Sequence, residues 1–155
     1  MITFGKGQLQ FNYRTVGVAL NNNQVLLHKS ENDYFWSLPG GRVEFLEIAR
    51  DALKREMLEE LNIEVRVERL LWVVENFFEY DKKFYHELAL YFLMFLPDGS
   101  NLYSQAEQFE GNEEGLNLIF QWYKLDALKY IELYPRFLYK SLMSIPEVTV
   151  HIVQN

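Results

Sequence analysis

Residues 41–63 read GRVEFLEIARDALKREMLEELNI, and their periodicity predicts a helix in the second part of this stretch. Leu53, Met57 and Leu61 recur every four residues, so a helix would align them in one apolar stripe that faces a core. Asn62 follows the stripe, and after Gly it is the residue best suited to the left-handed conformation that ends many helices. We therefore expect the helix to end at this residue, although no residue of the usual capping types precedes its start.

Three acids, Glu56, Glu59 and Glu60, lie beside the apolar stripe rather than on the far side of the helix. Glu56 and Glu60 are like charges one turn apart, which costs a helix about a few tenths of a kcal/mol. Clustered carboxylates next to a Gly-Gly turn suit Mg²⁺ or Mn²⁺, because these hard cations take oxygen ligands and bridge to phosphates. Arg55 can fix the rotamer of Glu56 with its planar fork, and Gly41 would let a backbone carbonyl approach a metal closely. An ordinary amphipathic helix with a charged flank gives the same pattern, so the charges alone name no reaction.

The composition indicates a globular protein rather than a nucleic-acid-binding or membrane protein, and an enzyme fits it. The chain has 155 residues, the size of one domain, and 49% of them are apolar, which is enough for a packed interior. Its net charge of −7 argues against a nucleic-acid polymer as partner. It has no Cys, so it can form neither a disulfide nor a thiolate metal site. Because no apolar run could span a bilayer and the first residues form no apolar stretch of signal-peptide type, we expect no membrane partner and a cytoplasmic location.

The rest of the chain alternates strand and helix patterns in the order β-β-β-α-β-β-β-α-α-β. Asp81-Lys82 predicts a hairpin turn, and the three Asn residues at 21–23 predict a turn between the first two strands, which we expect to pair. The expected strands are 11–20, 24–28, 34–38, 64–79, 83–96, 118–123 and 147–153, the helices about 47–61, 125–131 and 135–143, and the loop 98–117. Helices are too few for a doubly wound parallel sheet, so a mixed α+β sandwich is the better interpretation.

The spacing of residues 41–63 resembles the Nudix box, which reads Gly, five residues, Glu, seven residues, then Arg-Glu-apolar-any-Glu-Glu-any-Gly-apolar. Gly41, Glu47 and the run from Arg55 to Ile63 match it, and only Asn62 departs, standing where the family has Gly. Trp36-Ser37-Leu38-Pro39-Gly40 also resembles the usual lead-in. Six fixed residues match, a coincidence on the order of 10⁻⁸ at about 6% usage per residue type. The resemblance implies one Nudix (MutT-like) domain over 1–155, with an α/β/α sandwich around a mixed, mostly antiparallel sheet.

The same resemblance implies a metal-dependent pyrophosphohydrolase, in which water attacks phosphorus and cleaves a nucleoside diphosphate linked to another moiety. Glu56, Glu59 and Glu60 would bind Mg²⁺ or Mn²⁺, with the Gly41 carbonyl as a further ligand. Arg55 would orient Glu56 or pair with Glu47. The general base stays open between Glu56 and a glutamate of the acidic segment 104–114, Glu113 or Glu114 in particular.

Residues outside the box would select the substrate. Tyr80 lies where relatives that cleave dinucleoside polyphosphates carry a Tyr that stacks on a base, although ten tyrosines make such a match easy. Arg14 and Glu47 are further candidates for substrate binding, whereas His28 resembles an ordinary sheet residue. A non-catalytic Nudix-like nucleotide sensor is the alternative, and it is disfavoured because the box keeps every acid. An isomerase on the same scaffold is disfavoured because it would need Cys or more His ligands. A homodimer is left open.

Overall fold

The computed structural model describes residues 1–113 and 115–155, which form two β-sheets with helices on both sides. In sheet A the strands lie in the order β1 (Thr3–Lys6), β2 (Leu9–Val18), β7 (Lys83–Phe95), β6 (Arg66–Tyr80) and β10 (Val150–Gln154), with β5 (Gly40–Arg42) paired to β2. In sheet B the order is β3 (Leu20–Asn21), β4 (Gln24–Ser30), β9 (Leu116–Lys124) and β8 (Phe109–Glu113). The helical segments are α1 (Ala49–Leu61), η1 (Asn101–Ser104), η2 (Leu125–Tyr130) and α2 (Leu138–Ser141).

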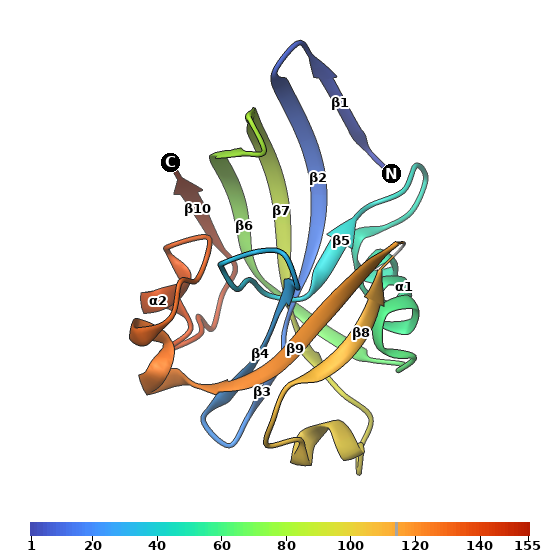
Figure 1. Ribbon diagram of the computed structural model, residues 1–155, viewed down its shortest axis with the longest axis vertical. Helices are drawn as coiled ribbons and strands as arrows, with labels where there is room; N and C mark the ends of the chain where they lie inside the picture. The colour runs from blue at the N-terminus through green and yellow to red at the C-terminus, as the bar shows by residue number, and fades with distance from the viewer. Residues whose placement is uncertain (114) are drawn as a thin grey trace.

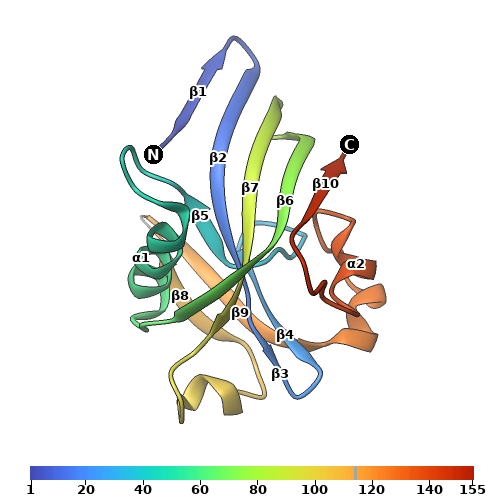
Figure 2. The ribbon, with the colours of Figure 1, turned by 180° about the vertical axis from the view of Figure 1, so that it is seen from behind.

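The layers form the α/β/α sandwich expected from the sequence. Helices α1 and α2 lie on opposite sides of the sheets, as the front and back views show (Figures 1 and 2). Sheet A is mixed, because β2 pairs with β7 and β6 with β10 in parallel, while its other pairs are antiparallel. The pairs within sheet B are all antiparallel. None of the helices in the described part of the chain is long and apolar enough to cross a membrane.

The β6–β7 hairpin confirms the predicted turn at residues 81 and 82. Asp81 and Lys82 have φ values of 48° and 62°, which is the pair of positive φ angles that a tight two-residue hairpin requires. Asn22 and Asn23, with φ of 51° and 60°, make the equivalent turn between β3 and β4.

The predicted pairing of 11–20 with 24–28 holds only next to the turn and is wrong for the rest of the first strand. The chain leaves sheet A at Val18 and enters sheet B at Leu20, so the first predicted strand is divided between two sheets. Of the predicted strand only Leu20 pairs with β4, whereas β2 lies beside β7, a strand more than sixty positions later in the sequence. Alternation along a strand indicates its faces and carries no information about its partner.

Five further expectations need correction. No strand forms at 34–38, where Trp36 and Ser37 make isolated bridges, and Gly40 and Gly41 lie in strand β5 rather than in a turn. The segment 98–117 is not one loop, because it contains η1 and β8. The predicted helix at 125–131 is the 3₁₀ segment η2, and the one at 135–143 is reduced to the four residues of α2.

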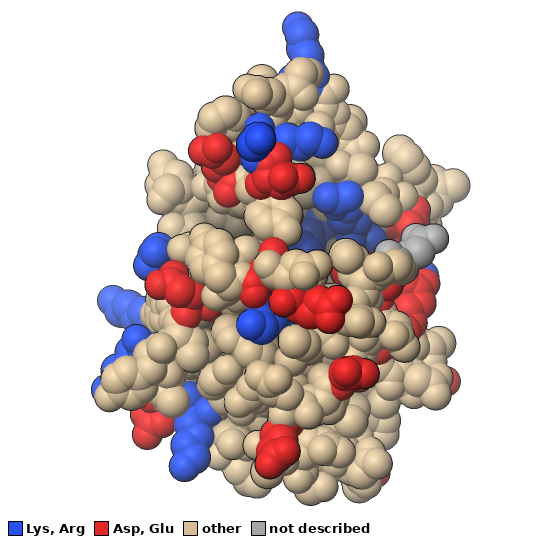
Figure 3. All heavy atoms as spheres, in the orientation of Figure 1, with Lys and Arg blue, Asp and Glu red and all other residues tan. Residues whose placement is uncertain are grey.

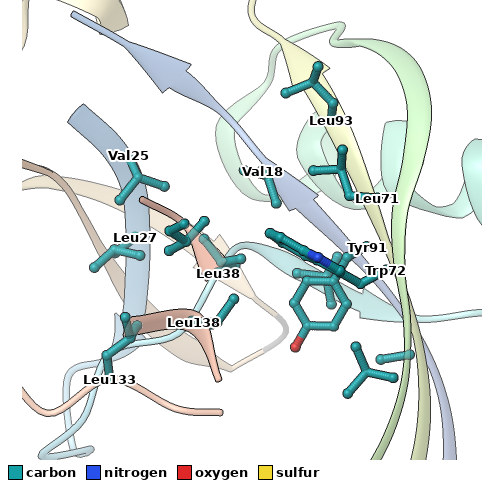
Figure 4. Packing of buried hydrophobic residues seen from close by; sticks show 14 of the residues in the cluster. Val18, Val25, Leu27, Leu38, Leu71, Trp72, Tyr91, Leu93, Leu133 and Leu138 are labelled. Atoms are coloured by element: carbon teal, nitrogen blue, oxygen red, sulfur yellow. The ribbon is translucent and has the colours of Figure 1, made fainter. Parts of the chain in front are cut away.

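Two groups of buried apolar side chains hold the layers together. The first fills the space between the sheets and α2, and Figure 4 shows Trp72 and Tyr91 of sheet A facing Leu27, Leu38 and Leu138. The second joins α1 to both sheets and includes fully buried Phe120. At about 25 cal/mol per Å² of apolar surface, burial of this kind is the main stabilising contribution to the fold.

Candidate active site

The apolar stripe of α1 fixes the helix against the second core group. Leu53 and Met57 are fully buried there, and Leu61 packs against the same group at its edge. The small residues Ala49 and Ala52 let the helix approach β2 closely, and the Thr15 hydroxyl donates a hydrogen bond of 2.8 Å to the Ala49 carbonyl. The acids next to the stripe are therefore carried to the boundary of the core.

The two ends of α1 behave as the sequence indicates. Ile48 stands at the N-cap position and makes no side-chain capping bond. Asn62 ends the helix with φ 54° and ψ 40°, and its N–H donates to the Leu58 carbonyl at 2.9 Å. The left-handed ending at Asn62 is confirmed.

Arg55 ties α1 to the segment that precedes it. Its Nε and Nη2 donate to the two oxygens of Glu47 at 2.8 and 3.0 Å, while Nη1 donates to Glu56 Oε1 at 2.9 Å. A fourth hydrogen bond runs from Nη2 to the Arg42 carbonyl at 3.2 Å. The hydrogen bonds from Arg55 hold the pKa of Glu47 below its ordinary value. Arg55 therefore both pairs with Glu47 and orients Glu56, which the sequence left as alternatives.

Gly41 leaves room for the carboxylate of Glu56. A Cβ built at Gly41 would overlap the carboxyl carbon and both oxygens of Glu56, so no side chain larger than hydrogen fits here. Gly41 pairs with Thr15 of β2, which holds this backbone in place. Burial raises the pKa of Glu56, against the opposing effect of Arg55.

Glu60 is buried without a hydrogen-bond partner. The residue is 3% exposed, and both its oxygens and Nδ1 of His28 are enclosed with no partner among the described residues. Nδ1 of His28 lies 3.9 Å from Oε2 of Glu60. Burial, followed by the charges of Glu56 and Glu113, raises the pKa of Glu60 to about 9. Burial and the charge of Arg14 lower the pKa of His28 to about 3, so the two groups are neutral at pH 7 and form no ion pair despite their distance.

The unpaired oxygens of Glu60 fit a cation, because an enclosed carboxyl group without a hydrogen-bond partner is costly for the fold. Glu56 lies beside it, and Gly41 keeps the space in front of Glu56 free of a side chain. Glu59 differs, since its side chain is 59% exposed and lies 3.5 Å from Nη1 of Arg55. Across residues 1–113 and 115–155, no three His, Asp or Glu side chains are already gathered around one point.

Glu113 reaches the same region from strand β8. Gly111 of β8 lies against the Phe120 ring and the Glu60 carbonyl, so β8 packs on the last turn of α1. Glu113 is exposed and is near enough to raise the pKa of Glu60. The predicted loop at 98–117 is wrong for this residue, because β8 is paired with β9. Glu114 lies outside the described residues.

Arg14 and Tyr80, the two candidates for substrate binding outside the box, have different surroundings. Burial raises the pKa of Glu56 and Glu60, and the positive charge of Arg14 on β2 acts in the opposite direction on both, so Arg14 lies within electrostatic reach of them. Tyr80 ends β6, where its hydroxyl donates to Asp33 at 3.0 Å and its ring meets Phe35 edge-on. Tyr80 therefore lies against the loop between β4 and β5, which is here called the rim. Figure 3 shows Lys and Arg side chains in the floor of a hollow on this face, with Asp and Glu along its lower edge.

Sequence reasoning missed His28 and three buried polar residues of sheet A. His28 was expected to be an ordinary sheet residue, but it is the neighbour of Glu60. Asn12, Asn76 and Glu87 are all buried on strands that otherwise bury apolar residues. The sequence does contain a signal for such residues, which is a polar residue at a position that alternation turns inward on an apolar strand. Glu87 in the run Tyr85 to Tyr91 is an example.

Comparisons with known proteins agree with this arrangement. A family model described as NUDIX domain matches residues 12–142. An 8-oxo-dGTP diphosphatase from Buchnera aphidicola is 29% identical over 119 residues, covering 74% of this chain and 78% of that protein. The low-salt glycan biosynthesis protein Agl8 from Haloferax volcanii is 37% identical over 124 residues, covering 72% and 78%. The crystal structure of an ADP-ribose pyrophosphatase from Streptococcus suis has a TM-score of 0.61 at 17% identity, covering 92% and 98%, and shares the fold.

The chain belongs to the Nudix family. It is a hydrolase that acts on phosphorus-containing acid anhydrides.

Proposed function

We propose that the chain is a metal-dependent pyrophosphohydrolase, with residues 1–155 as one Nudix domain, that cleaves a nucleoside diphosphate linked to another moiety by attack of water on phosphorus. The observation that carries this proposal is Glu60, whose two buried oxygens lack any partner among the described residues while Glu56 lies beside them. A pair of carboxylates in such a place is suited to a divalent cation. The names of the relatives, a diphosphatase and a pyrophosphatase, support the same class of reaction.

Glu56, Glu60 and the Gly41 carbonyl would hold Mg²⁺ or Mn²⁺, and Glu59 would join them after its side chain leaves Arg55. The cation supplies a Lewis acid that neutralises the charge of the diphosphate. Arg55 keeps Glu56 in one rotamer through its bonds to Glu47 and Glu56, so little order has to be gained when the substrate binds.

The remaining roles fall to groups around this pair. Arg14 presents a positive charge to the diphosphate from β2. Glu56 or Glu113 takes the proton from the attacking water, and Glu114 is a third candidate for that role. Tyr80 would stack on a base at the rim, and Glu47 would position the segment that contacts the substrate.

A substrate screen tests the proposal directly. Nucleoside diphosphate sugars, dinucleoside polyphosphates and nucleoside triphosphates are each incubated with Mg²⁺ and with Mn²⁺, and the products are identified by mass. Repeating the active reactions in ¹⁸O-labelled water should place one heavy oxygen on a phosphate product, because water attacks phosphorus. Label on the sugar or alcohol would contradict this mechanism. Binding without turnover across the screen would favour the nucleotide-sensor alternative.

A further inference from the structure

Three polar residues form a continuous row across the face of sheet A that is turned toward sheet B. Asn12 of β2 is aligned with Glu87 of β7, and Glu87 is aligned with Asn76 of β6. These three residues, here called the polar row, are 3%, 7% and 7% exposed in that order. Strand alternation puts Tyr91 and Trp72 on the same face, and both belong to the first core group. The polar row, made of one carboxylate and two amides, is therefore buried on the same sheet face as the apolar core.

The hydrogen-bonding capacity of the polar row is largely unused. The Thr3 hydroxyl donates to Oδ1 of Asn12 at 2.8 Å, which turns the amide nitrogen toward Oε2 of Glu87 at 3.5 Å, at the limit of a hydrogen bond. Neither Oε1 of Glu87 nor the amide of Asn76 has a side-chain partner among residues 1–113 and 115–155.

These free groups are nevertheless open to solvent. In the described chain, the enclosed polar atoms without partners belong to His28 and Glu60 alone. The free oxygen of Glu87 and the amide of Asn76 must therefore reach solvent-accessible space, although their residues are 7% exposed. Polar groups that face solvent-accessible space without a protein partner are available to hydrogen-bond a ligand.

On the same face of sheet A, a cationic side chain lies on one side of the polar row and two aromatic rings lie on the other. Arg14 lies two residues beyond Asn12 on β2, about 6.6 Å along the strand. It is on the side of the polar row where Glu56 and Glu60 lie. Two residues along in the other direction, Phe78 and Tyr85 stack with ring centroids 5.0 Å apart and planes at 7°. Among the described residues, no ion pair joins Arg14 to Glu87 or to another carboxylate. A diphosphate at Arg14 would thus place its attached group over the polar row.

We propose that the polar row is a specificity subsite, in which Glu87 accepts hydrogen bonds from two adjacent donors on the group attached to the diphosphate. This inference rests on the proposed function. Two sources present such a pair of donors: the imino and amino groups of a guanine base, and the vicinal hydroxyls of a pentose. Asn76 supplies a further donor and acceptor beside Glu87, and Phe78 with Tyr85 provides the apolar surface on which a ring packs.

Binding of reaction products without metal separates these two sources. The base arm compares GMP with IMP, which lacks the amino group, and the pentose arm compares ribose 5-phosphate with 2-deoxyribose 5-phosphate, all by calorimetry at millimolar concentration in EDTA. In one arm the wild-type chain should prefer the donor-complete ligand by about tenfold, as expected for a hydrogen bond to a charged acceptor. Glu87→Gln should abolish that preference, because an amide offers one acceptor in place of two.

Glu79→Gln is the matched control, since it neutralises an exposed carboxylate of β6 on the opposite face. It should keep the full preference. If Glu87→Gln fails to fold by circular dichroism, Asn76→Ala is measured instead and should weaken binding of the preferred ligand. A folded Glu87→Gln protein that keeps the preference, or a wild-type chain that shows none in either arm, would overturn the inference. Because these titrations need no turnover, a chain that hydrolyses nothing contradicts the proposed function without deciding this result.

Discussion

Asn62 stands where the Nudix box has Gly, and its backbone explains why the substitution is tolerated. With φ 54° and ψ 40° it occupies the left-handed region, where Asn is the best residue after Gly. Asn62→Gly should therefore be neutral or slightly stabilising, because Gly carries no Cβ. Asn62→Val should destabilise the fold by about 1 kcal/mol or more, because a β-branched side chain resists this conformation. Thermal melts of both variants measure the difference.

The same Val variant should also lower turnover, since the last turn of α1 carries Glu59 and Glu60. If Val were tolerated as well as Gly, the left-handed ending of the helix would not matter for stability.

Glu60 and His28 make the stability of the metal-free chain depend on pH. The pKa of Glu60 is raised from 4.5 to about 9, so the folded chain holds a proton that the unfolded chain has released, and stability falls as pH rises through this interval. The pKa of His28 is lowered from 6.5 to about 3, so His28 opposes this trend only below 6.5. In EDTA, the melting temperature should fall as the pH rises from 6.5 to about 9.

Glu60→Gln should remove most of this fall and raise the melting temperature at the alkaline end, because an amide does not ionise. Mg²⁺ should partly restore the wild-type protein there, since a bound cation stabilises the ionised carboxylate. An equally steep decline in Glu60→Gln would show that some other group titrates.

At the scale of elements, Arg55 joins α1 to the segment between β5 and the helix. Its fork binds both oxygens of Glu47, and the same side chain reaches Glu56 and the Arg42 carbonyl. Lys keeps the charge but cannot form these bonds together. Arg55→Lys should therefore cost about 1 kcal/mol or more of stability and lower kcat, as measured by urea denaturation and steady-state kinetics. Arg66→Lys, at an exposed pair with Glu68, is the control and should change neither.

Strand β8 carries Glu113, one of the candidates for the general base. If Glu113 is the general base, Glu113→Gln should lower kcat, keep the affinity for Mn²⁺ and lose the acidic limb of the pH–rate profile. Glu110→Gln, an exposed acid on the same strand, is the matched control. An unchanged rate and profile in Glu113→Gln would return the role to Glu56 or Glu114.

Local patterns predicted some elements well. The helix periodicity predicted α1, and the Asp81-Lys82 turn predicted the β6–β7 hairpin, because both depend on neighbours in the sequence. Strand β5 was not predicted, and the helix predicted at 135–143 is much longer than the four residues of α2. Two glycines indicate a turn by their residue type alone, and only their pairing with β2 makes them a strand.

At the scale of the molecule, the pairings that create the site were beyond local reasoning. Strand β2 passes from sheet A into the connection to sheet B and lies parallel to β7, and this brings Arg14 toward α1 and Asn12 beside Glu87. The box spacing predicted that Glu56 and Glu60 share one helix edge. It could not predict that Glu60 loses every hydrogen-bond partner, because His28 and β8 enclose it from sheet B.

We infer that the buried carboxylates of α1 make diphosphate hydrolysis possible by binding a divalent cation. Turnover at saturating Mg²⁺ in Glu56→Gln and Glu60→Gln, with the substrate found in the screen, tests it most directly. Each variant should fold and lose at least about 100-fold in kcat, because removing one ligand removes stabilisation of the transition state. Asp51→Asn, an exposed acid on the same helix, should keep the wild-type rate. Near-wild-type turnover in both glutamine variants would contradict the account.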